Sequence, residues 1–213
     1  MRNSRHLMFI IRFFTACVAA GNAAAVSVEE LADREEIRDL VYCYALGADT
    51  IGNGSLGAAA EKMGLDIFTG CFTEQATFAV WPAGMPFDRL AFPSRKGDRP
   101  PAFIIEGRAA WAGAINASFR GPAGGVGYDF VQHNLTNIDI DIDGNSADVT
   151  AYLSSVHVIR GESMAAMRCR QEAHGTYSLR VSKEDGSWMI TSLDLAQIAY
   201  DAVIENGGGC SGG

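Results

Sequence analysis

The sequence predicts an α+β fold with a mostly antiparallel sheet. Apolar residues in the first half of the chain recur at helical spacing, whereas those in the last third alternate with a period of two, as in strands. Asp-Gly pairs separate the later strands at positions that suit hairpin turns. The resulting order is helix, helix, strand, strand, helix and then four long strands, which is typical of α+β proteins.

Composition limits the classes of function. The chain has 213 residues, of which 48% are hydrophobic and 20% charged, so it is neither disordered nor collagen-like. This length suits one domain. The net charge is −8 and basic residues are concentrated nowhere beyond the N-terminus, so we expect no nucleic-acid partner.

Residues 1–25 have the layout of a secretory signal peptide. Their charged residues are all arginines, an apolar stretch follows, and small residues precede a cleavage site that we place after Ala25. The alternative is a misassigned start codon. We expect a domain over 26–204, a disordered Gly-rich tail over 205–213, and a periplasmic or secreted protein with no membrane partner after cleavage.

Four cysteines remain beyond the expected cleavage site: Cys43, Cys71, Cys169 and Cys210. No CxxC or Cys/His spacing indicates zinc. In an oxidising compartment a bridge between Cys43 and Cys71 could join two successive helices. Buried free thiols are the alternative.

The expected helices cover 28–51, 55–69 and 107–119. In the first, Ile37 and Tyr44 belong to one apolar face of helical spacing, and glycines stop the helix. Ser55 is the expected N-cap of the second. Five of the six prolines lie in a loop over 82–102. The expected strands cover residues 76–81, 103–106, 128–143, 147–160, 165–181 and 187–198.

Within 128–143 the alternation raises a question of phase. His133 and Ile138 differ by five positions, so a regular strand would turn them to opposite faces. Either His133 faces away from the isoleucines, or a bulge between them resets the phase. Asp139, Asp141 and Asp143 alternate with the isoleucines, which favours a solvated face over a metal site.

Five segments together resemble the SnoaL-like branch of the nuclear-transport-factor-2-like superfamily, which includes polyketide cyclases, scytalone dehydratase and hexachlorocyclohexane dehydrochlorinase. In order they are LADREEIRDLVYCYALGADT, FTGCFTEQATF, IIEGRAAW, QHNLTNIDIDIDGNSADVTAYL and HGTYSLRVSKEDGSWMI. The resemblance implies a cone-shaped, strongly bent sheet packed on three helices around an internal pocket. Relatives often dimerise through the open face of the sheet, so we expect a homodimer or homotrimer.

The resemblance also implies a site. Catalytic relatives carry an Asp near the end of the first helix and a His on a central strand, which correspond here to Asp49 and His133. His157, on the next strand, matches a second His of scytalone dehydratase. Where the dehydrochlorinase has an Arg, this chain has Leu193, which argues against halide release.

These residue types suit proton abstraction from carbon. An imidazole has an unperturbed pKa of about 6.5, so His133 could serve as the general base. A buried carboxylate at Asp49 would fix its tautomer and stabilise the imidazolium. His157 and Tyr44 could protonate a leaving hydroxyl or polarise a carbonyl. The expected activity is that of a cofactor-independent lyase or isomerase, since no P-loop, GxGxxG, GxSxG or HExxH motif occurs.

Four aromatic residues are expected to line a pocket for a small hydrophobic or aromatic substrate: Trp81, Phe103, Trp111 and Phe130. Three alternatives stay open. The protein could bind a ligand without catalysis, with Asp49 and His133 apart or exposed. It could be an assembly module with a filled pocket, or resemble the small subunits of ring-hydroxylating dioxygenases, which lack a site. His157 could be structural, and His174 is a weaker candidate than either other histidine.

Overall fold

The structure is a computed structural model that describes residues 26–83, 100–120, 127–160 and 167–204. The expected signal peptide, most of the proline-rich loop and the Gly-rich tail lie outside these residues and stay predictions. The predicted order of elements is confirmed. The helices are α1 (Val28–Ile51), α2 (Ala59–Thr69) and α3 (Arg108–Phe119), with a short 3₁₀ turn η1 (Gly54–Leu56) between the first two.

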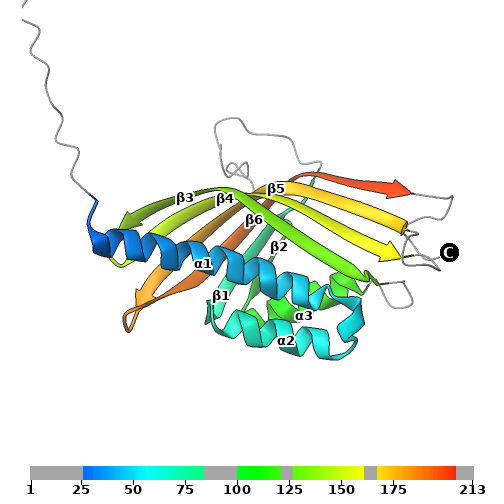
Figure 1. Ribbon diagram of the computed structural model, residues 1–213, viewed down its shortest axis with the longest axis horizontal. Helices are drawn as coiled ribbons and strands as arrows, with labels where there is room; N and C mark the ends of the chain where they lie inside the picture. Colours follow the sequence, from blue (N-terminus) through cyan, green and yellow to red (C-terminus); the bar gives the residue numbers. More distant parts are fainter. Residues whose placement is uncertain (1–25, 84–99, 121–126, 161–166, 205–213) are drawn as a thin grey trace, which may run out of the picture.

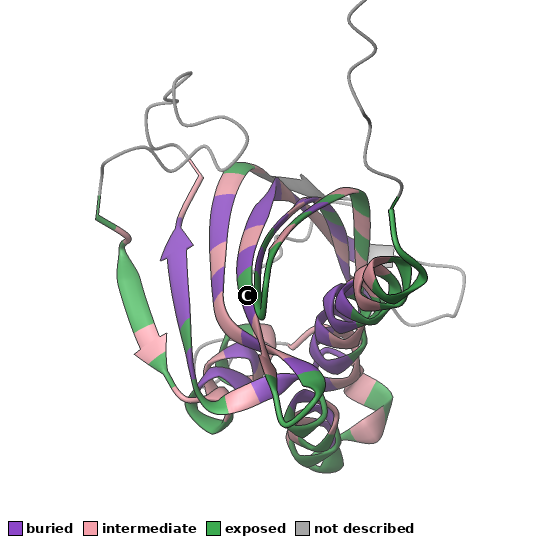
Figure 2. Cartoon of the chain, turned by 90° about the vertical axis from the view of Figure 1, so that its left-hand side faces the viewer, coloured by how far each residue is buried: buried purple, intermediate pink, exposed green. Residues whose placement is uncertain are grey.

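Six strands form one open sheet in the order β2-β1-β6-β5-β4-β3. The β1–β6 pair is parallel and the others are antiparallel. The sheet curves over the helices (Figure 1), and buried segments alternate with more exposed ones along several strands (Figure 2). The predicted α+β fold is therefore confirmed. The strands are β1 (Phe72–Trp81), β2 (Phe103–Glu106), β3 (Phe130–Asp143), β4 (Ser146–Arg160), β5 (Met167–Glu184) and β6 (Ser187–Ile204).

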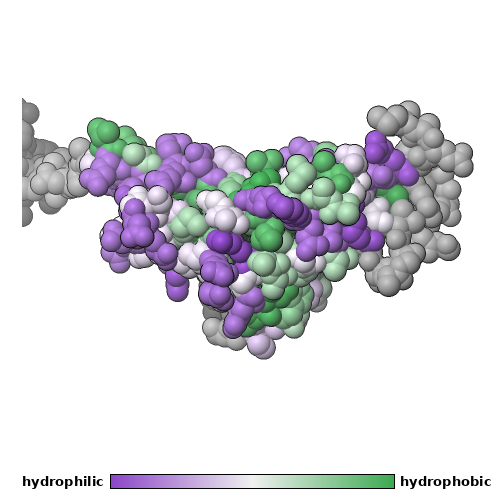
Figure 3. Space-filling model, turned by 90° about the horizontal axis from the view of Figure 1, so that it is seen from below, coloured by the Kyte–Doolittle hydropathy of each residue, from purple (hydrophilic) through white to green (hydrophobic). Residues whose placement is uncertain are grey.

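Helix α1 has the bounds predicted from its apolar spacing. Ser27 caps it by accepting the backbone N–H of Glu30 at 3.0 Å, and the acidic first turn suits the positive end of the helix dipole. Its inner face, which includes Ile37 and Tyr44, is buried under the sheet. Viewed from the helical side, the surface carries both hydrophilic and hydrophobic residues (Figure 3). Among the described residues, no helix has the length and apolar character to cross a bilayer.

The second predicted helix is wrong at its start. Ser55 does not cap α2, because it lies in the separate turn η1, where Asn53 Oδ1 accepts its backbone N–H and its hydroxyl. Gly57, at φ +55°, interrupts the helical conformation between η1 and α2. The Asn53 side chain caps this short turn, and the positive φ of Gly57 ends it before α2 begins, so α2 starts later than its apolar spacing indicates.

A bulge resolves the phase question in β3. The pairing of β3 with β4 shifts register between Thr136 and Asp139, and Asn137 adopts φ +52°. Before the bulge His133 points to the inner side, and after it the isoleucines do, so both halves of one strand face the helices. Of the two alternatives that the sequence left open, the bulge is the one observed.

Candidate active site

Cross-strand pairing brings the two predicted histidines to one face. His133 on β3 pairs with Ser155 on β4, and Val131 pairs with His157. Residues directly opposite in an antiparallel pair point to the same side, so both imidazoles and the Ser155 hydroxyl face the helices. The two imidazole rings lie 6.1 Å apart between centroids.

The last turn of α1 places a carboxylate against His133. Asp49 Oδ1 lies 2.7 Å from His133 Nδ1, and it also accepts the backbone N–H of His133 at 2.9 Å. The His133 side chain is 6% exposed and the Asp49 side chain 27%. A carboxylate oxygen at this distance requires Nδ1 to carry the proton, which leaves Nε2 of the neutral ring as an acceptor.

His133 lies in the wall of a cavity of about 180 Å³ between the sheet and the helices. A cavity of roughly 150 Å³ holds a benzene molecule in an engineered protein, so this one suits a small cyclic ligand. The expected filled pocket of an assembly module is therefore not observed. The cavity is lined by Tyr44, Val80, Phe103, Trp111, Ala114, Ile115, Ser118, Phe119, Tyr128, His133, Leu153, Ser155, His157, Ala173, Tyr177, Leu195 and Gln197.

Most of the predicted site residues meet at this cavity. Tyr44, Phe103, Trp111, His133 and His157 line it, and Asp49 lies behind His133. The non-catalytic alternative expected the Asp49 and His133 side chains to be apart or exposed, and they are in contact instead.

Two predicted lining residues are elsewhere. Phe130 is 47% exposed, because it alternates with inward-facing Val131. Trp81 follows Val80, which faces the cavity. The Trp81 side chain therefore projects from the opposite face of β1, where it packs with Ala79 and Ala196. In both strands the predicted residue is one position away from a residue that faces inward, so its side chain points to the opposite face.

Tyr177, which is 1% exposed, also lines the cavity and was not predicted from the sequence. Its hydroxyl lies 3.2 Å from that of Tyr44, and their rings meet edge to face. Tyr177 has the same parity along β5 as Ala173 and Leu179, which are also buried, and this shared face was the available signal. Ser155 and Phe119 were also missed. Ser155 shares the inner face of β4 with Leu153, and Phe119 follows Ile115 at a helical spacing of four in α3.

Burial controls the protonation of the tyrosine pair. Burial raises the pKa of Tyr44 to about 12, while its hydrogen bond with Tyr177 acts in the opposite direction. Burial also raises the pKa of Tyr177 well above 10. Both phenols are therefore neutral hydrogen-bond donors at physiological pH.

His157 is held neutral. Burial and then the nearby His133 lower its pKa to about 4. The rings of Phe119 and Tyr128 pack on it, at 5.3 and 4.9 Å between centroids. A neutral imidazole can donate an N–H bond but is a poor proton donor at neutral pH. This favours the carbonyl-polarising alternative over protonation of a leaving group.

The low pKa of His157 predicts acid lability. An unfolded His binds a proton below about pH 6.5, whereas the folded one does so only near pH 4. Its contribution to stability is therefore full above pH 6.5 and falls by about 3 kcal/mol toward pH 4. We expect His157→Gln to reduce this pH dependence, as measured by urea unfolding at several pH values, whereas His174→Gln keeps it. Equal slopes in the wild type and His157→Gln would contradict this.

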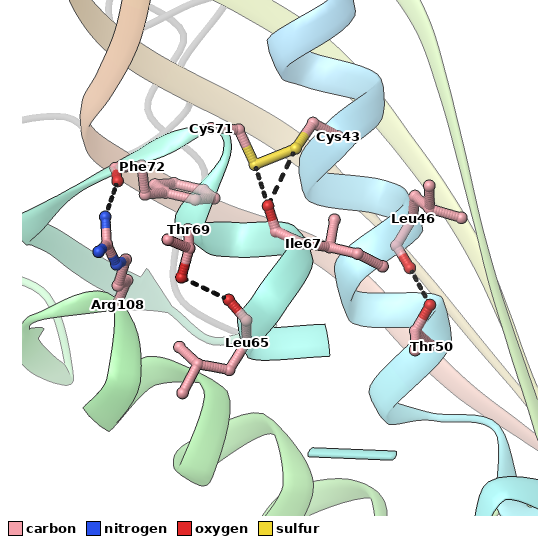
Figure 4. The surroundings of a disulfide bond; sticks show 9 residues. All are labelled: Cys43, Leu46, Thr50, Leu65, Ile67, Thr69, Cys71, Phe72 and Arg108. Carbon is pink, nitrogen blue, oxygen red and sulfur yellow. Dashed lines mark hydrogen bonds between the residues drawn. A yellow bond between two sulfur atoms is a disulfide. The ribbon is translucent and has the colours of Figure 1, made fainter. Parts of the chain in front are cut away.

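A disulfide joins α1 to the start of β1. Cys43 and Cys71 are bonded, with Cα atoms 6.3 Å apart, and both sulfurs lie near the carbonyl oxygen of Ile67 (Figure 4). The disulfide alternative for these two residues is thus the observed one. Cys169 is also disulfide-bonded. The bridge precedes Tyr44 in α1 and Phe72 in β1, whose rings meet edge to face.

The family follows from a match over most of the chain. The SnoaL-like domain family matches residues 29–194. The chain belongs to the SnoaL-like family. The resemblance that the sequence motifs indicated is therefore confirmed over residues 29–194.

Solved structures support the fold of this SnoaL-like protein. Kfla4162 of Kribbella flavida is 20% identical, with TM-score 0.54, over 80% of this chain and 94% of its own. A putative scytalone dehydratase of Novosphingobium aromaticivorans is 16% identical, with TM-score 0.52, over 84% and 93%. The dehydrochlorinase LinA-type3 of Novosphingobium barchaimii is 12% identical, with TM-score 0.55, over 82% and 92%. No curated protein matches the sequence.

Two other features of the SnoaL-like domain bear on its chemistry. Leu193 is 1% exposed and packs in the apolar core, so this position offers no charge to a leaving halide. Within the described residues, no three His, Cys, Asp or Glu side chains cluster as a metal site. Asp139, Asp141 and Asp143 are all exposed, as expected for a solvated face.

Proposed function

We propose that this protein is a cofactor-independent lyase or isomerase that removes a proton from carbon in a small hydrophobic or aromatic molecule. The observation that supports this most directly is the contact of Asp49 with His133 at the wall of an apolar cavity. A base at this position is shielded from bulk water and keeps one nitrogen for the substrate.

In this proposal His133 Nε2 takes the proton, and Asp49 positions the ring. The double acceptance at Asp49 Oδ1, from the ring N–H and the backbone N–H, fixes the imidazole in one tautomer. As positive charge develops on His133, the carboxylate stabilises it. His157 and Tyr44 act as neutral donors toward the oxygen of the substrate.

We also propose that the protein is exported and assembles as a homodimer or homotrimer. The Cys43–Cys71 disulfide supports export, since structural disulfides persist in oxidising compartments. N-terminal sequencing of the protein secreted by its host and light scattering of the purified protein test these two points.

The proposed proton abstraction can be tested with acetophenone, a small aromatic ketone with acidic methyl protons. We expect the protein in D₂O to accelerate replacement of these protons by deuterium, because His133 removes them and solvent returns deuterons. Loss of the methyl signal in proton NMR measures the rate. Acetophenone that binds, by a rise in melting temperature, and exchanges no faster than in buffer would contradict the proposal.

A further inference from the structure

Gln197 interrupts an apolar row on the inner face of β6. The residues that precede it on this face, Leu193 and Leu195, are buried. Alternation along the strand places Gln197 on the same face, and its side chain lines the cavity together with that of Leu195. The pairing with β5 shifts register directly after Gln197, so this residue ends the row. An amide at the end of an apolar row is expected to have hydrogen-bond partners.

One end of the Gln197 amide is occupied. Its Oε1 accepts the backbone N–H of Ala83 at 3.3 Å. Because only the oxygen of an amide can accept an N–H, this bond determines which end of the side chain is Oε1 and which is Nε2. Nε2 carries two N–H donors, for which the described residues offer no acceptor. Gln197 therefore offers donors to a ligand in the cavity.

Gly175 leaves the inner face beside this amide uncovered. Leu153 on β4, Gly175 on β5 and Gln197 on β6 lie directly opposite one another in the sheet. Leu153 and Gln197 both line the cavity, and glycine places no side chain between them. A Cβ atom on Gly175 would lie 2.6 Å from the carbonyl oxygen of Ala196, so another residue would not fit here without a shift of the backbone.

The amide and the proposed base lie on different walls of the cavity. His133 is on β3 and Gln197 on β6, three strands apart in the sheet. At the usual spacing of strands this is about 14 Å along the sheet, and both side chains line the same cavity. A ligand that fills the cavity can thus place a C–H group at His133 and a second group at Gln197.

We propose that Gln197 is a specificity-determining residue, whose Nε2 donors bind a second oxygen of the substrate, remote from the carbon that loses its proton. This rests on the proposed function for the fate of the substrate, while the binding subsite stands on its own contacts. It assigns the substrate to ring compounds that carry a carbonyl beside the acidic C–H and a second acceptor oxygen at the opposite end.

Charge favours a neutral oxygen over a carboxylate at Gln197. None of the described cavity-lining residues is Lys or Arg. A carboxylate in this cavity would lose its hydration and gain no cation, which is costly in an apolar environment. A carbonyl oxygen has lone pairs for the amide N–H and brings no proton that would need an acceptor.

The test compares para-diacetylbenzene with para-isopropenylacetophenone, in which a CH₂ group replaces one carbonyl oxygen. In Gln197→Glu an oxygen remains for the N–H of Ala83, and the Nε2 donors are lost. We expect the Kd for diacetylbenzene, divided by the Kd for the isopropenyl compound, to rise about tenfold, the loss of one hydrogen bond. Calorimetry at about pH 8, where a Glu side chain is ionised, measures both constants.

Gln197→Met is the second variant, because it removes the donors without adding a charge, and it decides the question if Gln197→Glu does not fold. It should raise the same ratio of Kd values. Gln75→Glu is the matched control, since Gln75 is exposed on β1 and absent from the cavity wall, and it should leave the ratio unchanged.

Three results would overturn the subsite. The first is no binding of diacetylbenzene to the wild type. The second is an unchanged ratio in Gln197→Met, even if both Kd values rise, since Gln197 would then serve only to hold Ala83. The third is a rise in Gln197→Glu alone, which would reflect repulsion by the new carboxylate.

Deuterium exchange of the diacetylbenzene methyl groups separates this inference from the proposed function. A tenfold change of the ratio, with exchange no faster than in buffer, would contradict the proton abstraction and leave the subsite standing. Fast exchange that depends on His133, with an unchanged ratio in the Gln197 variants, would overturn the subsite alone.

Discussion

Replacing His133 by Gln is expected to lower the rate of deuterium exchange of acetophenone by about 10²- to 10⁴-fold, the usual contribution of a general base. Gln is similar in length and can keep a donor toward Asp49, but it has no basic nitrogen. Because the side chain borders a cavity, we expect the melting temperature to change little. Proton NMR and thermal unfolding measure the two effects.

His174→Gln is the matched control for this experiment. His174 lies on β5 with its side chain 41% exposed, and it is absent from the cavity wall. Its replacement should leave the exchange rate within twofold of the wild type. If His133→Gln retains wild-type exchange, another group is the base. If it unfolds instead, His133 is structural, and the bond to Asp49 serves stability.

Removing the Cys43–Cys71 disulfide is expected to cause the largest loss of stability. The bond closes a loop with a sequence separation of 28, and its loss returns about 3–4 kcal/mol of chain entropy to the unfolded state. In Cys43→Ala/Cys71→Ala we therefore expect the melting temperature to fall by about 10 °C. Scanning calorimetry measures this.

The double variant is preferable to a reductant, because reduction would also break the bond of Cys169. Dithiothreitol should lower the melting temperature of the wild type by at least as much as the double replacement does. A double variant that melts within about 2 °C of the wild type would contradict a stabilising role for the Cys43–Cys71 bond.

Most of the fold could be predicted from the sequence, because the helical and strand periodicities of its apolar residues are clear. The apolar spacing of 28–51 defined α1 to the residue, and the alternation around Ile138 defined the inner face of β3. The start of α2 was wrong, because Asn53 competes for the backbone locally. Such a turn depends on hydrogen bonds to a single side chain, and these produce no periodic pattern in the sequence.

The candidate site was only partly visible in the sequence. Asp49 and His133 came from the resemblance, and Asp49 stands on the flank of the apolar face, where periodicity alone is ambiguous. Trp81 and Phe130 were predicted to line the cavity but face the other side of their strands. Which residues of a strand face inward depends on where the strand starts and where it bulges, and neither is visible in the sequence. Tyr177 was missed because its partner hydroxyl comes from a helix far away in sequence, and only the folded chain brings the two together.

The bulge at Asn137 divides β3 into two parts with separate tasks. One additional residue lets the chain present the His133 imidazole and the isoleucines to the same interior, although their numbering places them on opposite sides. Deleting that residue would cost either the contact of His133 with Asp49 or the burial of the isoleucines, since only one half of the strand could keep its side chains inward.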